Sequence, residues 1–142
     1  MSNKIQKYLL ETLSCVEKAP LECDGFSLML ASKFDEAGWP YKRFAGIVRD
    51  SVSLKTVSPH LWIETHGYII DYRLRMWLPD QPAIRVPHGV FTSSSARQAG
   101  FIYDGEPVSC HGISKSIIRL MSDGYSDKFR LKPYINTDQC NQ

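Results

Sequence analysis

The chain has 142 residues, which is enough for one domain whose single hydrophobic core needs no disulfide or metal to stabilise it. Its 43% hydrophobic content is that of an ordinary globular protein, and its net charge of +2 is too small to indicate binding to nucleic acid or to an anionic membrane. No segment has the apolar run of a signal peptide or the roughly 20 apolar residues of a membrane span, so we expect a cytoplasmic protein.

Two helices are predicted at the start of the chain. The first covers about residues 3–18, where apolar side chains recur with a period near 3.6, and Pro20 prevents its continuation. The second covers about residues 23–37, and Gly38 and Pro40 follow it in the usual order of helix terminators. Both helices are therefore amphipathic and need a partner surface for their apolar faces.

A strand and a hairpin are predicted next. Residues 41–50 fit a strand, and 51–59 form a polar connection. The stretch "HLWIETHGYIIDYRLRMW", residues 60–77, alternates aromatic and β-branched residues around His66 and Gly67, and Gly67 can take the positive φ of a tight turn. A two-residue turn predicts that residue 65 pairs with 68, 64 with 69, 62 with 71 and 60 with 73.

The remaining chain predicts less regular structure. Residues 79–100 contain three prolines and a Ser/Thr-rich patch, which indicates a loop wrapping the sheet with one short edge strand. Residues 101–108 fit another strand, 112–124 a short helix and 136–142 a frayed tail. The whole chain, 1–142, is thus predicted to be one α+β domain with N-terminal helices packed on an antiparallel sheet.

The four cysteines are predicted to be reduced thiols. They are irregularly spaced, at positions 15, 23, 110 and 140, in a chain without a secretion signal. The sequence has no CxxC motif and no zinc-ligand spacing, so we expect no metal ion and no cofactor. Cys110 and His111 are adjacent, and neighbouring side chains on a strand point to opposite faces, which disfavours a shared metal or redox site.

Cys23 is a candidate nucleophile because of its position at the start of the second predicted helix. Unpaired backbone N–H groups and the helix dipole stabilise a thiolate there. The alternative is that Cys23 is a packed core thiol, since cysteine is among the most buried residue types. Glu22, directly before it, favours this alternative because a neighbouring carboxylate raises the pKa of a thiol.

His60 and Asp71 can supply the base and the orienting group that a cysteine nucleophile needs. In the predicted hairpin they lie on one face as diagonal neighbours, roughly 7–8 Å apart at Cα, and any even change in turn length keeps them there. Glu64 lies on the same face and is an alternative orienting carboxylate. Trp62, between the two, is expected to be core or a pocket wall.

These elements together resemble the transglutaminase-like superfamily of papain-like cysteine enzymes. The similar features are Cys23 opening a helix, Gly38-x-Pro40 with a basic residue soon after (Lys42 or Arg43), the motif "HLWIE", and an aspartate after "GYII". The resemblance spans residues 22–72, about a third of the chain.

The resemblance implies a papain-like fold and a catalytic triad of Cys23, His60 and Asp71. Cys23 would form an acyl thioester from a peptide or protein substrate with a carboxamide or amide bond, His60 would transfer the proton, and Asp71 would hold the imidazole tautomer. Water as the second substrate gives a peptidase, amidase or deamidase, and an amine gives a transamidase. A protease that matures a modified peptide is a special case of this activity.

A catalytically inactive relative remains the alternative, an interaction module that binds a peptide or protein in the former cleft or at residues 79–91. No glutamine stands near Cys23 as an oxyanion donor, since Gln6 is in the first helix. The backbone N–H of Cys23 and the indoles of Trp39 and Trp62 are the candidates. His66 and His88 are expected to be turn residues, and the arginines at 43, 49, 73 and 75 are expected to solvate a sheet edge.

Overall fold

The protein is an α+β domain built on one antiparallel sheet, as predicted. The structure, a computed structural model, describes residues 2–109 and 113–135. In these ranges the sheet has five strands in the order β4-β3-β2-β1-β5, each antiparallel to its neighbours. The strands are β1 Lys42–Asp50, β2 Thr56–Thr65, β3 Tyr68–Asp71, β4 Gly89–Phe91 and β5 Phe101–Val108. The α-helices are α1 Ser2–Leu13, α2 Cys23–Ala37, α3 Ser93–Gln98 and α4 Lys115–Met121.

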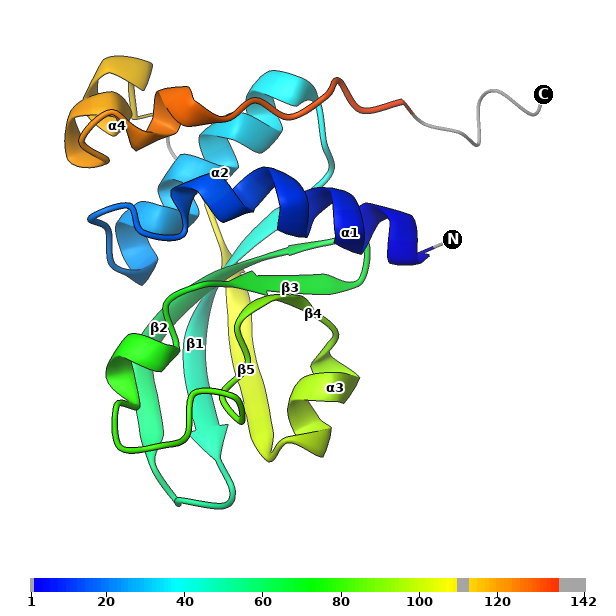
Figure 1. Cartoon of the computed structure of the whole chain (residues 1–142), viewed down its shortest axis with the longest axis vertical. Helices are drawn as coiled ribbons and strands as arrows, with labels where there is room; N and C mark the ends of the chain where they lie inside the picture. Colours follow the sequence, from blue (N-terminus) through cyan, green and yellow to red (C-terminus); the bar gives the residue numbers. More distant parts are fainter. Residues whose placement is uncertain (1, 110–112, 136–142) are drawn as a thin grey trace.

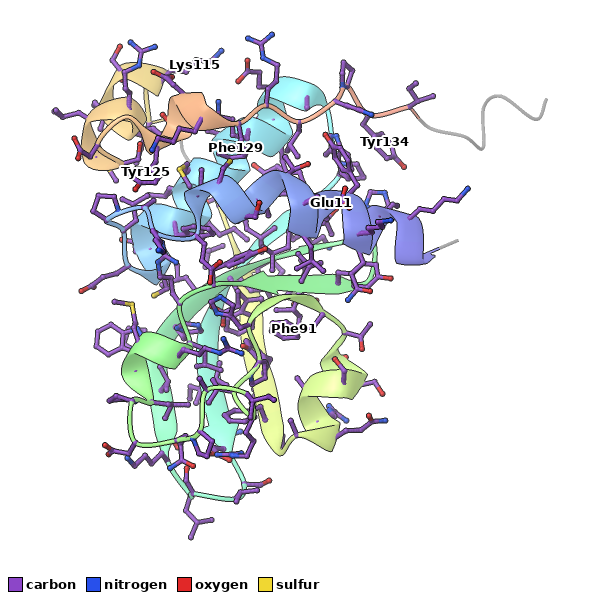
Figure 2. The ribbon with its side chains drawn as sticks, in the orientation of Figure 1. Glu11, Phe91, Lys115, Tyr125, Phe129 and Tyr134 are labelled. Carbon is purple, nitrogen blue, oxygen red and sulfur yellow. The ribbon has the colours of Figure 1, made fainter. Side chains whose placement is uncertain are left out.

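Two hydrophobic clusters lie on opposite faces of this sheet. Figure 1 shows α1, α2 and α4 on one side of the sheet, and α3 with the connection after β3 on the other. The first cluster joins the helices to the sheet and includes Leu9, Leu13, Phe26, Leu30, Phe34, Ile63, Ile70 and Phe129. The second includes Val48, Trp62, Ile69, Leu74, Phe91 and Phe101. Consecutive strand residues therefore enter different clusters, as the alternation of side chains requires, and Figure 2 shows Phe129 and Phe91 on the two sides.

The second predicted helix has its expected limits, whereas the first is shorter than predicted. Gly38 follows α2 with a φ of 75°, and the N–H of Trp39 donates to the carbonyl of Phe34 at 2.9 Å, which completes a left-handed C-cap. The prediction of a helix over 3–18 was wrong at its end. α1 stops at Leu13, and the chain tightens into a 3-10 turn, η1 (Ser14–Val16).

The hairpin has the predicted turn and register, but its first strand is longer and its second strand shorter than predicted. β2 begins at Thr56, inside the predicted connection 51–59. Thr65 pairs with Tyr68, and Glu64 pairs with Ile69. The turn residues His66 and Gly67 have φ values of 52° and 79°, as a type I′ turn requires. However, β3 ends at Asp71, and the chain bends into η2 (Arg75–Trp77). The predicted pairing of residues 60 and 73 is therefore absent.

The backbones of β1 and β5 lie unusually close together at Gly46 and Gly105, next to the Trp62 ring. A Cβ atom on Gly46 would lie 2.1 Å from the carbonyl oxygen of Asp104, and one on Gly105 would lie 2.7 Å from the Trp62 ring. His60 pairs with Gly46, and the register between β1 and β2 shifts directly after this pair. The glycines thus let the sheet curl at the point where His60 sits.

The C-terminal part of the described chain covers α2. The edge strand β4, the strand β5 and the helix α4 all fall inside the predicted segments. The prediction of a loop over 79–100 was wrong where α3 forms, because the Thr92 side chain caps this helix by accepting a hydrogen bond from the N–H of Ser95 at 3.1 Å. After η3 (Tyr125–Lys128) the chain runs across α1 and α2, as Figures 1 and 2 show, and the N–H of Tyr134 donates to Ala37 at 2.9 Å. The predictions for Cys110, His111, Cys140 and the tail 136–142 lie outside the described residues. Within the described ranges, no helix is long and apolar enough to cross a membrane.

Candidate active site

Cys23 occupies the first turn of α2, as predicted, and is free of any disulfide. Its side chain is largely covered, because the residue is only 8% exposed. Glu22 precedes it in extended conformation and makes no side-chain cap to the helix. Cys15, the other free thiol in the described part of the chain, is exposed and provides a natural reference for thiol reactivity.

His60 and Asp71 form a buried pair. Nε2 of His60 lies 2.6 Å from Oδ2 of Asp71, and the two side chains are 0% and 1% exposed. Nδ1 of His60 has no hydrogen bond of standard geometry within the described residues. Because Asp71 occupies Nε2, Nδ1 is the nitrogen left for the Cys23 thiol, whose interaction with the ring acts on the pKa of His60.

The electrostatic environment keeps His60 protonated at neutral pH. Burial is the largest influence and lowers the pKa of His60. The charge and hydrogen bond of Asp71, together with the influence of the nearby Cys23 thiol, outweigh burial and raise the pKa of His60 to about 9. The ring is therefore an imidazolium that can stabilise a thiolate and donate a proton.

Asp71 stays ionised although it is buried. Burial raises the pKa of Asp71, but the charge and hydrogen bond of His60 lower it, and two further donors add to this effect. The hydroxyl of Tyr103 donates to Oδ2 at 2.7 Å, and the backbone N–H of Arg73 donates to Oδ1 at 2.9 Å. Three hydrogen bonds hold the carboxylate, and the pKa of Asp71 is below its usual range.

Tyr103 is a site residue that the sequence analysis did not find. It lies on β5, which reaches the site only because β5 pairs with β1. The Tyr103 ring also packs edge-on against Trp62, with ring centroids 5.0 Å apart. The only signal in the sequence was an aromatic residue in a predicted strand, and that signal does not indicate which strand it faces.

Arg73 connects the loop after Asp71 with the segment before Cys23. The expectation that it solvates a sheet edge was wrong, because Arg73 is only 6% exposed. Its guanidinium donates to the carbonyl of Ala19 at 2.9 Å and to that of Leu21, and it lies over the Phe26 ring. Arg73 thus contacts Asp71 through its backbone N–H and the segment before Cys23 through its side chain.

Arg43 braces the first turn of α2 from β1. It is 8% exposed, so the expectation of a solvated edge was also wrong here. Nε donates to the Ser27 hydroxyl at 2.8 Å, and the guanidinium forms an ion pair with Asp24. Arg43, and not the exposed Lys42, is thus the basic residue after the helix that contacts the helix carrying Cys23.

Arg49 is exposed, with its side chain 52% accessible and paired with Asp104, but it lies on the inner strand β1. Arg75 is half-buried in η2, where Nε donates to the Val86 carbonyl at 3.1 Å, so it does not solvate a sheet edge.

The indole N–H groups of the other sequence candidates have partners elsewhere. The indole N–H of Trp39 donates to the Lys132 carbonyl at 2.7 Å, and that of Trp62 donates to Glu64 at 3.1 Å, so neither indole is free to bind an oxyanion. The carboxylate that is hydrogen-bonded to His60 is that of Asp71, whereas Glu64 accepts from Trp62. The backbone N–H of Cys23 remains the candidate oxyanion donor.

His66 and His88 have structural partners. His66 is a turn residue, as predicted, whose Nδ1 lies 2.9 Å from the Thr65 hydroxyl. The prediction that His88 is a turn residue was wrong, because His88 lies outside any turn directly before β4, and its Nε2 lies 2.5 Å from Glu17. Within the described residues, no group of three or more His, Cys, Asp or Glu side chains has an arrangement that could hold a metal ion.

Cys23 opens onto a cleft between the start of α2 and the strands β1 and β2. The cavity has a volume of about 650 Å³, and Cys23, Arg43, Leu61 and Trp77 are among its lining residues. A volume of this size is typical of small-ligand and peptide side-chain sites.

No family model matches the chain, and no curated protein or solved structure matches it either.

Proposed function

We propose that this protein is a cysteine-dependent acyl-transfer enzyme of transglutaminase-like type, with a papain-like arrangement of Cys23, His60 and Asp71. The observation that carries the proposal is the buried His60–Asp71 hydrogen bond of 2.6 Å, formed by a ring that also interacts with a cysteine at a helix N-terminus. A thiol, an imidazole and an orienting carboxylate in this order are the parts that nucleophilic acyl transfer requires. The adjacent cleft offers room for a substrate.

In the first half-reaction the Cys23 thiolate attacks the carbonyl carbon of an amide. The carbon–sulfur bond forms as the carbonyl electrons move to oxygen, where the N–H groups of the first turn of α2 stabilise the charge. The His60 imidazolium then donates its proton to the departing amine as the carbon–nitrogen bond breaks. The products are an acyl thioester on Cys23, a neutral amine and a neutral imidazole.

In the second half-reaction His60 acts as the base. It accepts a proton from water or from a second amine as that nucleophile attacks the thioester, and the carbon–sulfur bond then breaks to release the thiolate. Asp71 holds the ring in the orientation that directs Nδ1 to the thiol, and it stabilises the imidazolium that is re-formed. Water yields a hydrolase, and an amine yields a transamidase.

The proposal is tested by the pH dependence of iodoacetamide labelling, read at each cysteine by peptide mass spectrometry. Cys23 should label readily already at neutral pH, because the imidazolium stabilises the thiolate. His60→Gln should remove this behaviour and leave the exposed Cys15 unchanged. His66→Gln, which changes another histidine of the same hairpin, is the matched control and should label as the unmodified protein does.

The same experiment separates the enzyme from an inactive relative that binds a peptide or protein partner. If Cys23 labels like Cys15 in both the unmodified protein and His60→Gln, the thiol is a packed side chain and the binding module is the better description. If Cys23 is activated, peptide amides can be screened with water and with hydroxylamine as acceptors. Formation of a hydroxamate then identifies a transamidase, and its absence alongside amide cleavage identifies a hydrolase.

A further inference from the structure

Two cavities lie beside Glu22, the residue directly before Cys23. The larger hollow, about 650 Å³, lies between the start of α2 and the strands β1 and β2, with Trp77 at its wall. The smaller, about 380 Å³, lies between residues 19–22 and the bend after β3, and Met76 belongs to its lining. Glu22 lines both hollows. A substrate held on both sides would therefore place its reactive bond beside Cys23.

The larger hollow, which we call the Trp77 cleft, is lined mainly by apolar side chains. They come from β1, β2, β5 and η2 and are Ala45, Val57, Pro59, Leu61, Trp77 and Val108. Trp77 is 45% exposed, an unusual state for a large aromatic ring beside a cavity. An apolar group that enters the cleft would cover this ring and gain the free energy of burial.

The charged residues at the Trp77 cleft leave a net negative charge, which would repel an anion. Asp24 and Arg43 both line it, but they neutralise each other in an ion pair, and Arg43 is further engaged by Ser27. Glu22 is exposed, and within residues 2–109 and 113–135 no cation forms an ion pair with it. The mouth of the cleft therefore carries one uncompensated negative charge next to the nucleophile.

We propose that the Trp77 cleft selects acyl donors with a bulky apolar group close to the reactive carbonyl and disfavours donors with an acidic group there. This inference rests on the acyl transfer proposed above, and it specifies the class of acyl donor that the enzyme would accept. Trp77 is the wall that the apolar group contacts, and Glu22 is the residue that repels a carboxylate. Neither residue takes part in bond making, so both are specificity residues.

The test compares three alkylating reagents at Cys23, with Cys15 in the same molecule as the reference thiol. N-benzyl iodoacetamide carries an apolar ring, iodoacetamide carries none, and iodoacetate carries a negative charge. The rate of N-benzyl iodoacetamide divided by that of iodoacetamide should be about tenfold higher at Cys23 than at Cys15, since burying most of a phenyl ring favours the cleft by roughly that factor. Iodoacetate should be disfavoured at Cys23 relative to Cys15.

Two variants locate the effect. Trp77→Ala should reduce the preference of Cys23 for the benzyl reagent severalfold, whereas Met76→Ala should leave it unchanged. Met76 is a fair control because it is 48% exposed, close to the value for Trp77, and lines the other hollow. Glu22→Gln should raise the rate of iodoacetate relative to iodoacetamide at Cys23, and this ratio cancels any change in the reactivity of the thiol itself.

The outcomes separate this inference from the proposed function. Equal benzyl preference at Cys23 and Cys15, or loss of the preference in Met76→Ala but not in Trp77→Ala, would overturn the assignment of the Trp77 cleft even if Cys23 is an activated thiol. A preference that Trp77→Ala removes supports the assignment even if His60→Gln leaves the pH profile unchanged. In that case the cleft binds apolar groups in a protein that is not an enzyme.

Discussion

At the scale of single residues, Asp71 determines the state of His60. Burial alone lowers the pKa of His60, and the charge and hydrogen bond of Asp71 reverse that effect. Asp71→Asn removes the charge and keeps the size, so the pKa of His60 should fall from about 9 to below its usual value of 6.5. Titration of the His60 ring by NMR measures this shift directly.

If the pKa of His60 did not depend on Asp71, it would be the same in Asp71→Asn as in the unmodified protein. If the His60 resonances in Asp71→Asn still titrated near pH 9, another group would have to hold the proton, and the role of Asp71 would be disproved. The labelling of Cys23 offers an independent reading. A neutral His60 cannot stabilise a thiolate by charge, so the labelling of Cys23 at neutral pH should slow in Asp71→Asn.

Arg73 should be one of the most sensitive positions in the chain for stability. Its guanidinium donates to the carbonyls of Ala19 and Leu21 in a buried setting, and Arg73→Met would remove both of these hydrogen bonds. We expect a loss of about 3 kcal/mol in the free energy of unfolding, measured by urea denaturation. Arg49→Met is the control, because Arg49 has only an exposed ion pair of 3.4 Å with Asp104 and should change stability by less than about 0.5 kcal/mol.

The three triad candidates could be chosen from the sequence, but the residues that support them could not. Cys23 follows from its place before an apolar helical repeat, and His60 and Asp71 follow from the parity of a hairpin with a recognisable turn. Tyr103 is 32 residues from Asp71 in sequence, and its contact depends on which strands pair. Arg73 has no local pattern that distinguishes a buried guanidinium from a solvated one.

At the scale of elements, two glycines test different physical requirements. Gly105 packs under Trp62, so that an added Cβ would lie 2.7 Å from the ring and 2.8 Å from the Ala45 carbonyl oxygen. Gly38 has open space around it but a φ of 75°. Gly105→Ala should cost on the order of 3 kcal/mol through steric overlap, and Gly38→Ala about 1 kcal/mol through backbone strain alone.

Denaturant unfolding followed by tryptophan fluorescence measures both glycine variants. Gly105→Ala should also shift the emission of the folded protein, because Trp62 must move away from β5. Gly38→Ala should leave the folded spectrum as it is. If the two variants lost equal stability and neither changed the spectrum, the close packing of β1, β5 and Trp62 would not be a requirement of the fold.

Local signals also explain which elements could be predicted. α2 and the β2–β3 turn have strong punctuation, with Gly38 and Pro40 after the helix and Gly67 in the turn. The early end of β3 was missed because the residues after Asp71 still alternate in the manner of a strand. There the long-range contacts of Arg73 with the segment before Cys23 override the local preference.

At the scale of the whole molecule, the sheet separates two hydrophobic clusters, and the candidate site combines residues from both sides of it. Cys23 comes from α2, and Tyr103 packs against the second cluster. The fold class was predictable from the order of helices and strands, since α1 and α2 come before the sheet. The pairing of β5 with β1 was not, because the two strands are joined through 50 residues of intervening chain and share no turn. That pairing brings Tyr103 to Asp71, so the complete site is a property of the assembled fold.

The coupling of the site to the fold predicts how stability depends on pH. The pKa of His60 is raised from 6.5 to about 9 in the folded state, so its contribution to stability is fully present below pH 6.5 and is lost as pH rises through about 9. Between pH 6 and pH 10 the free energy of unfolding should fall on the order of 3 kcal/mol further in the unmodified protein than in His60→Gln. Urea denaturation at a series of pH values gives this difference.

Comparison with His60→Gln isolates the imidazole, because the lysines and tyrosines are common to both proteins and their contributions cancel. The acid side has the opposite sign. The pKa of Asp71 is lowered in the folded state, so its contribution is present above its ordinary pKa of 3.8 and is lost as the pH falls further. Asp71→Asn should therefore flatten both limbs at once, since it removes the carboxylate and, with it, the raised pKa of His60. If the stability curves of the unmodified protein and of His60→Gln ran parallel on the alkaline side, His60 and Asp71 would not form an ion pair in the folded protein. The site would then lack the imidazolium on which the proposed chemistry depends.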